Sequence, residues 1–209
     1  MRIVAMSDTH LLHHKLVVPD GDVLVHCGDF SGKNDVEEYA EFFAWMSALP
    51  HEHKILIAGN HESLLDDFNR TVRKMIPDSI TYLQDSGATI EGLKFWGSPR
   101  TPSFPWMAFA HFADEVPEAR WSMIPSDVDV LVTHGPPYGI LDRNYAGQRI
   151  GDRDLMKRVR QVRPRLHLFG HVHDQNGRMQ RSGTTFVNAA IGDDDEDPNL
   201  SDRVQVIVL

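Results

Sequence analysis

The chain has one cysteine and no long hydrophobic run, and each absence excludes a class of protein. Cys27 alone cannot form an intrachain disulfide or a thiolate metal cluster, and because it follows the apolar run 23–25 we expect a small, buried core residue. No run of about 18 apolar residues occurs, so no membrane-spanning helix is predicted. The apolar stretch at residues 3–6 is too short for a signal peptide and runs into charged residues, which favours a cytoplasmic location.

Positive charge is also scarce, with 21 Lys and Arg against 30 Asp and Glu and a formal net charge of −9. Binding to an extended nucleic acid requires a basic surface, so this balance disfavours such a partner, although a short nucleotide is compatible with it. Carboxylates that hold divalent cations would cancel part of the negative charge locally. We expect the acidic run 193–197 to be a solvated loop rather than a metal site.

The 209 residues contain no internal repeat and no linker rich in glycine, serine or proline, so a single domain is predicted. What recurs instead is a short apolar run that leads into polar residues and glycine. This pattern is found in five segments: residues 3–10, 23–29, 55–62, 130–137 and 166–173. Such runs are typical of strands that are buried on both faces of a sheet.

Helical patterns lie between several of these segments. One helix is predicted from Asn34 or Asp35 to about Leu49, and a second one over residues 152–162. The other predicted elements are a hairpin over residues 88–96 that turns at residues 91–92 and closing strands over residues 184–187 and 204–208. Strands that alternate with helices, together with the hairpin, predict an α/β protein with mixed sheets, in which ligands bind at the carboxyl ends of the strands.

All five polar segments therefore fall where a ligand is expected. Seven of their side chains are candidate metal ligands: Asp8, His10, Asp29, Asn60, His134, His171 and His173. This mixed set of oxygen and nitrogen donors suits Mn²⁺, Fe²⁺/³⁺ or Zn²⁺ better than Ca²⁺ or Mg²⁺. The set is too large for one tetrahedral ion but suffices for two divalent ions if the carboxylate of Asp29 bridges them. Two such ions can clamp a phosphate and share a hydroxide nucleophile.

His61 directly follows the candidate ligand Asn60, so we expect its side chain to reach over the metals without binding them. A histidine in that position can protonate a leaving oxygen, which makes His61 the predicted general acid. Glu62 would either orient His61 or cap the helix that follows, and we favour the cap slightly.

Five motifs occur in one order along nearly the whole chain: Asp8-Thr9-His10, Gly28-Asp29, Gly59-Asn60-His61-Glu62, His134 and Gly170-His171-Val172-His173. In this order, each after an apolar run, they resemble the calcineurin-like metallophosphoesterase superfamily. Within it, residues 82–86, 133–137 and 162–167 are similar to the small metallophosphoesterase-domain proteins of the MPPED type.

The resemblance implies a four-layer α/β/β/α sandwich with two mixed β-sheets, formed by residues 1–209 as one metallophosphoesterase domain. It implies two metal sites, one held by Asp8, His10, Asp29 and His173 and the other by Asp29, Asn60, His134 and His171. The implied activity is metal-dependent hydrolysis of phosphodiesters, with cyclic nucleotides among the family's substrates.

One departure from the family bears on the substrate. Protein phosphatases of the superfamily follow the Gly-Asp motif with a further Asp and an Arg, where this chain has Phe-Ser-Gly-Lys at residues 30–33. The arginine clamp for a phosphomonoester is missing at that position, which disfavours a phosphomonoesterase. Two further functions are compatible with the same motifs, namely a nuclease that uses this site and a non-catalytic protein-binding scaffold.

Four residues are candidate substrate contacts because they lie on loops near the metal motifs: Arg100, Trp106, Tyr138 and Arg143. Trp106 belongs to the aromatic segment 103–112, which would suit a wall for a nucleobase, a loop packed on its own domain, or a contact within a homodimer. His111 in that segment is a weaker candidate contact. The remaining histidines divide into expected core residues, His26 and His167, and expected surface residues, His13, His14, His51 and His53.

Overall fold

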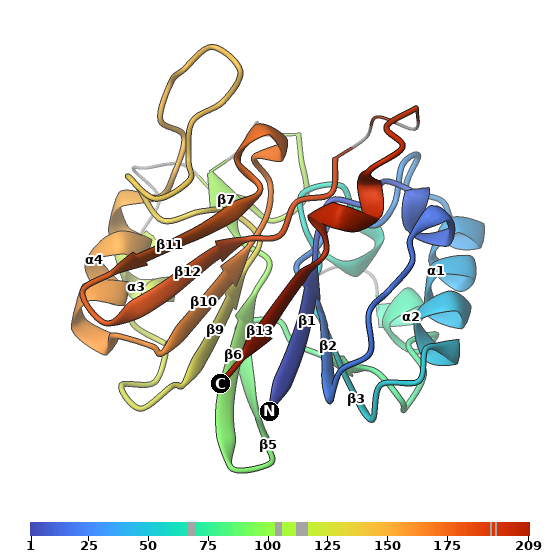
Figure 1. Cartoon of the computed structure of the whole chain (residues 1–209), viewed down its shortest axis with the longest axis horizontal. Coiled ribbons are helices and arrows are strands. Elements are labelled where there is room, and N and C mark those ends of the chain that lie inside the picture. The colour runs from blue at the N-terminus through green and yellow to red at the C-terminus, as the bar shows by residue number, and fades with distance from the viewer. Residues whose placement is uncertain (67–69, 103–105, 112–116, 193, 195) are drawn as a thin grey trace.

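The computed structural model describes the chain except residues 67–69, 103–105, 112–116, 193 and 195 and the side chains of residues 70, 111, 117 and 118 (Figure 1). The aromatic segment 103–112 and the acidic run 193–197 are therefore described only in part, and the side chain of His111 lies outside the described residues.

Two β-sheets form the centre of the fold, with strand orders β13-β1-β2-β3-β4 and β11-β12-β10-β9-β6-β5. The first sheet consists of β1 (Arg2–Met6), β2 (Val23–His26), β3 (His53–Leu56), β4 (Thr81–Tyr82) and β13 (Gln205–Val208). The second consists of β5 (Ser86–Ile90), β6 (Leu93–Ser98), β9 (Val130–Thr133), β10 (Leu166–Phe169), β11 (Gly177–Arg181) and β12 (Thr184–Asn188). Both sheets are mixed. In the first, β1 pairs antiparallel with β13 and parallel with β2, and in the second, β12 pairs antiparallel with β11 while β9 and β10 are parallel.

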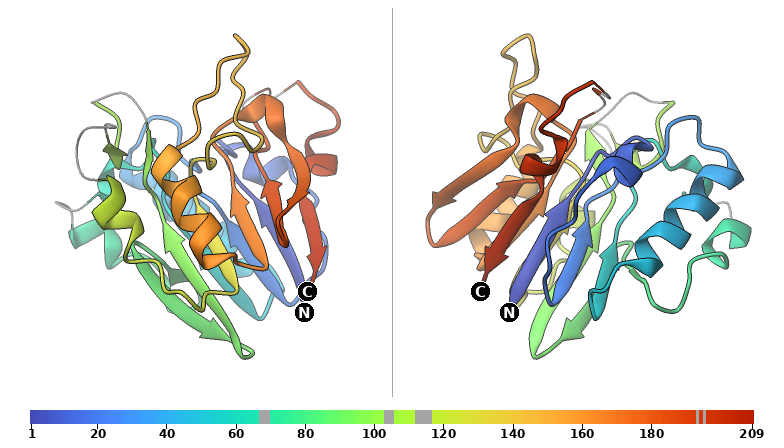
Figure 2. Two further views of the ribbon diagram at one scale, coloured as in Figure 1. Left: turned by 90° about the vertical axis from the view of Figure 1, so that its left-hand side faces the viewer. Right: turned by 45° about the vertical axis from the view of Figure 1, so that its right-hand side comes forward.

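The helices cover the outer faces of the sheets, as Figures 1 and 2 show. They are α1 (Val36–Ala48), α2 (Arg70–Arg73), α3 (Pro117–Trp121) and α4 (Arg153–Val162). The connecting segments contain the 3₁₀ helices η1 (Leu12–Lys15), η2 (Ser63–Leu65), η3 (His173–Gln175) and η4 (Leu200–Arg203). The strands β7 (Thr101–Pro102) and β8 (Ala110–His111) form a separate parallel pair. Asp35 caps α1 and Asp152 caps α4, because each side chain accepts backbone N–H groups of the first turn, so both predicted helices are confirmed.

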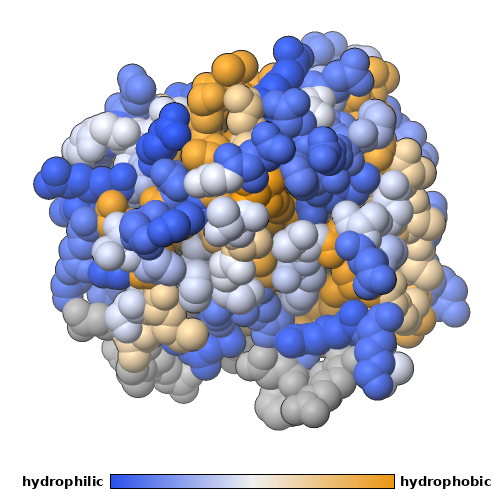
Figure 3. Space-filling view, turned by 90° about the horizontal axis from the view of Figure 1, so that it is seen from below, coloured by the Kyte–Doolittle hydropathy of each residue, from blue (hydrophilic) through white to orange (hydrophobic). Residues whose placement is uncertain are grey.

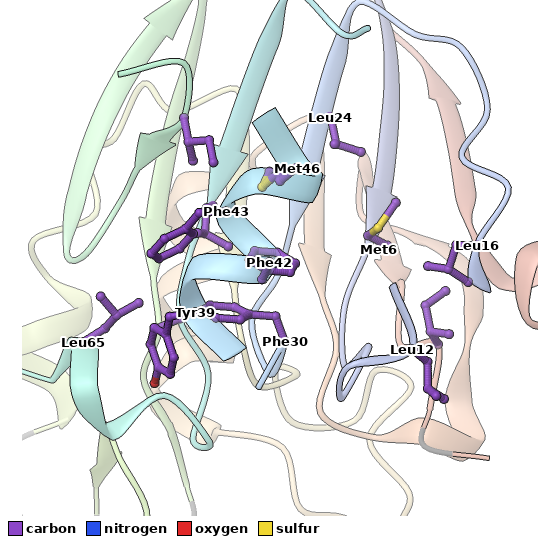
Figure 4. Packing of buried hydrophobic residues seen from close by; sticks show 14 of the residues in the cluster. Met6, Leu12, Leu16, Leu24, Phe30, Tyr39, Phe42, Phe43, Met46 and Leu65 are labelled. Carbon is purple, nitrogen blue, oxygen red and sulfur yellow. The ribbon is translucent and has the colours of Figure 1, made fainter. Parts of the chain in front are cut away.

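The side chains along β1 point alternately to the two faces of the sheet, which shows how the layers are formed. Ile3 and Ala5 belong to the apolar cluster between the two sheets, whereas Val4 and Met6 pack on the side of α1. Figure 4 shows Met6 in the cluster to which α1 contributes its buried side chains Tyr39, Phe42, Phe43 and Met46. A third cluster joins the outer face of the second sheet to Trp121 of α3 and to Leu155, Met156 and Val159 of α4. These clusters separate four layers, so the predicted α/β/β/α sandwich is confirmed.

The predicted hairpin is also present, with β5 paired antiparallel to β6 and Ile90 opposite Leu93. Its two turn residues, Glu91 and Gly92, both have positive φ, 49° and 80°. That conformation is required by the two-residue turns whose twist matches the flanking strands.

Two histidines that were expected at the surface are buried, so that expectation is wrong for His13 and His51, which are 1% and 2% exposed. The ring of His51 bonds to the carbonyl of Pro19 at 3.0 Å, while His13 packs under α1. Both lie next to polar residues in sequence, and only the tertiary packing covers them.

The two ends of the chain lie side by side at the amino end of β1, where the Met1 ammonium donates to the carbonyl of Leu209 at 3.2 Å (Figure 1). Seen from below, the molecule presents a largely hydrophilic surface with patches of hydrophobic residues (Figure 3). The loops that carry the five motifs are at the opposite edge of the sheets. Among the described residues, no helix is both long and apolar enough to cross a membrane.

Candidate metal centre

The five motifs follow the carboxyl ends of β1, β2, β3, β9 and β10 and converge at the upper edge of the two sheets (Figure 1). Backbone hydrogen bonds join their loops. Asp8 donates its N–H to the carbonyl of Gly28 at 2.8 Å, and Gly170 donates to the carbonyl of His134 at 2.9 Å. The N–H of His171 also donates to Oδ2 of Asp8 at 2.9 Å, which joins the loops of the two sheets into one cluster.

One group of potential ligands contains Asp8, His10 and His173, whose donor atoms all lie within 4.8 Å of one another. Nε2 of His173 is 3.5 Å from Oδ1 of Asp8 and 3.4 Å from Nε2 of His10. The carboxylate of Asp8 is fully buried and accepts the backbone N–H of His171 at 2.9 Å. Two imidazoles and one carboxylate at this spacing fit a divalent transition metal.

A second group contains Asp29, His134 and His171, again within 4.8 Å. Nε2 of His134 is 3.3 Å from Oδ2 of Asp29 and 2.9 Å from Oδ1 of Asn60, so Asn60 belongs to the same group. Nδ1 of His134 donates to the carbonyl of Cys27 at 2.9 Å, which turns Nε2 toward the other donors. All seven predicted ligand residues are therefore brought together in two neighbouring groups.

The buried carboxylates and imidazoles of these groups shift one another's pKa values. Burial by itself lowers the pKa of His134, but the charge of Asp29 and its hydrogen bond raise that pKa to about 10. Burial raises the pKa of Asp29, yet the charge of His134 and its hydrogen bond hold it well below its usual range. Burial raises the pKa of Asp8, but the hydrogen bond from His173 and the charge of His134 lower it to about 2. Both buried carboxylates thus require nearby positive charge, which divalent cations also supply.

The backbone of this cluster is strained in a way that aims its side chains. Asp8, His10, Asp29 and His171 all have positive φ, at 55°, 41°, 55° and 68°. Non-glycine residues rarely adopt this region, and each instance costs about 1–3 kcal/mol that the surrounding structure must offset. Strain of this kind concentrates at functional sites, and here four of the seven candidate ligands carry it.

Glycine is required where the backbone approaches the carboxylates most closely. A Cβ at Gly170 would lie 2.1 Å from Oδ2 of Asp8, and one at Gly59 would lie 2.3 Å from Oδ1 of Asp29. No side chain fits at either distance, so steric constraints require glycine at both positions.

His61 lies beside the first group. Its ring centroid is 4.8 Å from that of His10, and its donor atom lies within 4.8 Å of those of His10 and Asp29. Its backbone N–H donates to Oδ1 of Asp29 at 2.9 Å, and its side chain is partly exposed. The geometry suits a proton donor at the edge of the centre and would also allow a further ligand.

The structure supports neither of the two roles expected of Glu62, which makes no side-chain cap at η2. Its carboxylate instead accepts backbone N–H groups from Asp29 at 2.8 Å, Gly59 at 2.6 Å and Ser31 at 2.9 Å. Burial and the charge of Asp29 raise the pKa of Glu62 to about 7. Glu62 therefore ties the loop after β2 to the loop after β3, which sequence spacing could not reveal.

His26 and His167 are core histidines, as expected, and each also supports a ligand loop. Nε2 of His26 is 3.1 Å from Oγ1 of Thr9, and Nε2 of His167 is 2.8 Å from Oγ1 of Thr133, which in turn donates to the carbonyl of Gly135. Burial lowers the pKa of each histidine to about 3, so both rings are neutral. The supporting roles of Thr9 and Thr133, each next to a predicted ligand, were not predicted from the sequence.

Arg100 is buried and its guanidinium forms an ion pair with Asp85 at 3.1 Å, so its charge is neutralised inside the protein. It also lies 6.0 Å from the ring centre of Phe109. Trp106 is 76% exposed, which leaves its ring accessible to a ligand or a partner.

The other two candidate contacts lie in the segment between His134 and α4. The ring of Tyr138 is covered by the guanidinium of Arg153 at 3.8 Å. Arg143 is exposed and donates to the carbonyl of Gly147. These contacts hold the segment together locally.

Comparison with known proteins agrees with this geometry, because the calcineurin-like phosphoesterase profile matches residues 1–175. The chain belongs to the calcineurin-like phosphoesterase family. A UPF0046 protein of Caenorhabditis elegans is 41% identical over 203 residues, which cover 91% of this chain and 69% of that protein. Metallophosphoesterase domain-containing protein 1 of Homo sapiens is 38% identical over 214 residues, covering 91% of this chain and 66% of that protein.

This phosphoesterase thus spans about two thirds of the length of those relatives, and its similarity to MPPED-type proteins is confirmed. A solved crystal structure has a TM-score of 0.71 at 16% identity over 90% of both chains and shows the same fold. As a member of this family the protein is a metal-dependent phosphoesterase, and the groups around Asp8 and Asp29 contain donors of the kind that bind divalent ions.

Proposed function

We propose that the protein is a dinuclear phosphodiesterase that hydrolyses small phosphodiesters, cyclic nucleotides among them. The observation that carries the proposal is that Asp29, a buried carboxylate of the second ligand group, also has its donor atom within 4.8 Å of that of His10 in the first group. In this proposal one ion is held by Asp8, His10, Asp29 and His173, and the other by Asp29, Asn60, His134 and His171. Mn²⁺, Fe²⁺/³⁺ and Zn²⁺ match this donor set.

When bound, two such ions would supply an activated water as nucleophile and positive charge against the phosphate oxygens. The chain's own contribution is to hold the donors in place. Asp29 accepts the N–H of His61 on one oxygen and faces His134 with the other, so its carboxylate is oriented from both sides. Glu62 holds the backbone on which Asp29 sits.

His61 would protonate the departing alkoxide. Its partly exposed ring next to His10 is where a substrate oxygen could approach from solvent, while its backbone is anchored on Asp29. General acid catalysis of this kind contributes about 10²–10⁴-fold in rate.

The preference for a diester is supported by the residues that follow Asp29. Phe30 is fully buried and stacks on Phe42 at 4.1 Å, and Ser31 binds the carboxylate of Glu62. Neither offers a cation to the second negative charge of a monoester. We also propose that residues 1–209 form one catalytic domain that acts on a small nucleotide in the cytoplasm. Trp106 would be available for stacking or for a homodimer contact.

The test compares metal-stripped and Mn²⁺-loaded protein on a bis-aryl phosphodiester, cyclic nucleotides, nucleoside monophosphates and single-stranded DNA. We expect turnover of the diesters only after loading. His61→Ala should lose about 10²-fold or more in kcat while still binding metal. Equal activity of the stripped protein would overturn the proposal, and a higher kcat/KM for monophosphates or DNA would favour a phosphomonoesterase or a nuclease instead.

A further inference from the structure

A separate cluster of potential metal ligands lies on the outer side of the first sheet. His13 and His14 belong to η1, and Glu41 belongs to α1. One donor atom from each lies within 4.8 Å of the others, and none of the three residues is part of the groups around Asp8 and Asp29.

His13 is the least ordinary member of this cluster. It is 1% exposed, yet neither of its ring nitrogens has a hydrogen-bond partner within the part of the chain that the structure describes. A neutral imidazole carries one donor and one acceptor, and buried polar groups are nearly always paired. The ring packs against both Phe42 and Trp45, with centroid distances of 5.3 and 4.9 Å. A rigid imidazole with an unused lone pair is a preorganised ligand.

We propose that His13, His14 and Glu41 form a binding site for a transition-metal ion such as Zn²⁺, separate from the dinuclear centre. Two imidazoles and a carboxylate, completed by water, are a common donor set for tetrahedral Zn²⁺. His14 and Glu41 are exposed, so their side chains can adjust toward an ion while His13 stays in place. The rings of His13 and His14 are nearly perpendicular, at 89°, with centroids 5.8 Å apart.

An ion at this site would tether η1 to α1. Figure 4 shows Leu12 and Leu16, on either side of His13, on the same face of the first sheet as Phe42 of α1. His13 follows the candidate ligand His10 by three residues, so the tether would steady the loop that carries His10. The site would therefore stabilise this part of the fold without touching substrate.

The test uses untagged protein equilibrated with buffered Zn²⁺ and then analysed for bound metal. His14→Ala and Glu41→Ala should each bind about one equivalent of Zn²⁺ fewer than the wild type. Glu37→Ala, another exposed glutamate of α1, is the matched control and should bind as much as the wild type. Diester hydrolysis by the Mn²⁺-loaded variants should be retained.

Because only differences between variants are compared, the result does not depend on how many ions the dinuclear centre holds. Zn²⁺ should also shift the ¹⁵N resonances of the His13 ring in the wild type and in Glu37→Ala, but not in Glu41→Ala. Equal Zn²⁺ content in all variants, or a His13 shift that survives Glu41→Ala, would overturn the proposal.

Discussion

The carboxylate of Glu62 accepts the backbone N–H of Asp29 at 2.8 Å across 33 residues of sequence. The same carboxylate also accepts from Gly59, directly before Asn60. One buried side chain thus sets the relative position of two loops that carry candidate ligands. Residues that support ligands in this way commonly affect metal affinity about 10–100-fold.

Glu62→Gln should weaken both the fold and the metal centre. The amide presents an NH₂ group to buried N–H donors, and each donor left unpaired costs about 1–3 kcal/mol. We expect a lower free energy of unfolding in denaturant titrations and about 10–100-fold weaker binding of Mn²⁺. Glu38→Gln is the control, because Glu38 binds the backbone N–H groups of residues 32–34 instead. Equal metal affinity in the two variants would contradict this role of Glu62.

Gly170→Ala should displace Asp8. The new Cβ would lie 2.1 Å from Oδ2 of Asp8, a distance that no side chain tolerates, so the carboxylate must move away from His10 and His173. We expect a loss of metal from one site, measured by elemental analysis, and a large loss of diester hydrolysis. In Gly32→Ala the nearest atom is the flexible end of Leu11 at 3.1 Å, so that variant should keep its metal. A fully loaded Gly170→Ala protein would refute the steric argument.

His167 should make the protein less stable in acid. Burial lowers its pKa to about 3 in the folded state, below the value of about 6.5 for an unperturbed histidine. His167 therefore binds a proton in the unfolded chain but not in the folded one, and the free energy of unfolding falls as the pH drops from about 6.5 toward 3. Between about pH 7 and 5 this single group contributes about 2 kcal/mol to the decrease.

His167→Gln can still donate to Thr133 and removes this titration. Denaturant unfolding at both pH values should show a smaller loss of stability on acidification than in the wild type. An unchanged difference between the two pH values would show that His167 does not contribute as proposed.

The elements predicted from sequence are those with a local signal. The five buried strands carry continuous apolar runs, and Asp35 and Asp152 mark the two helices by their caps. The strand β11 has no such signal, because all five residues of Gly177–Arg181 are partly or fully exposed and the strand exists only by pairing with β12. Edge strands of this kind follow from tertiary pairing rather than from periodicity.

The candidate metal centre shows the same contrast between residues with a local sequence signal and residues that depend on tertiary contacts. Its candidate ligands were predicted because each follows a buried strand, and the strand ends of an α/β fold converge. The roles of Glu62, Thr9 and Thr133 depend on which loops become neighbours in three dimensions, and the burial of His13 depends on Phe42 and Trp45. A residue whose position follows from its own strand can therefore be predicted from the sequence. A residue whose role depends on contact with the loop of another strand cannot.

Cys27 offers a practical consequence of the packing beneath the centre. Its side chain is fully buried, and burial together with the charge of Asp8 raises the pKa of its thiol well above the ordinary value. A thiol in that state resists alkylation, so the native protein behaves as a cysteine-free background. A cysteine introduced at the exposed Tyr145 could therefore carry a single fluorescent or spin label without removing a residue of the core or a candidate substrate contact.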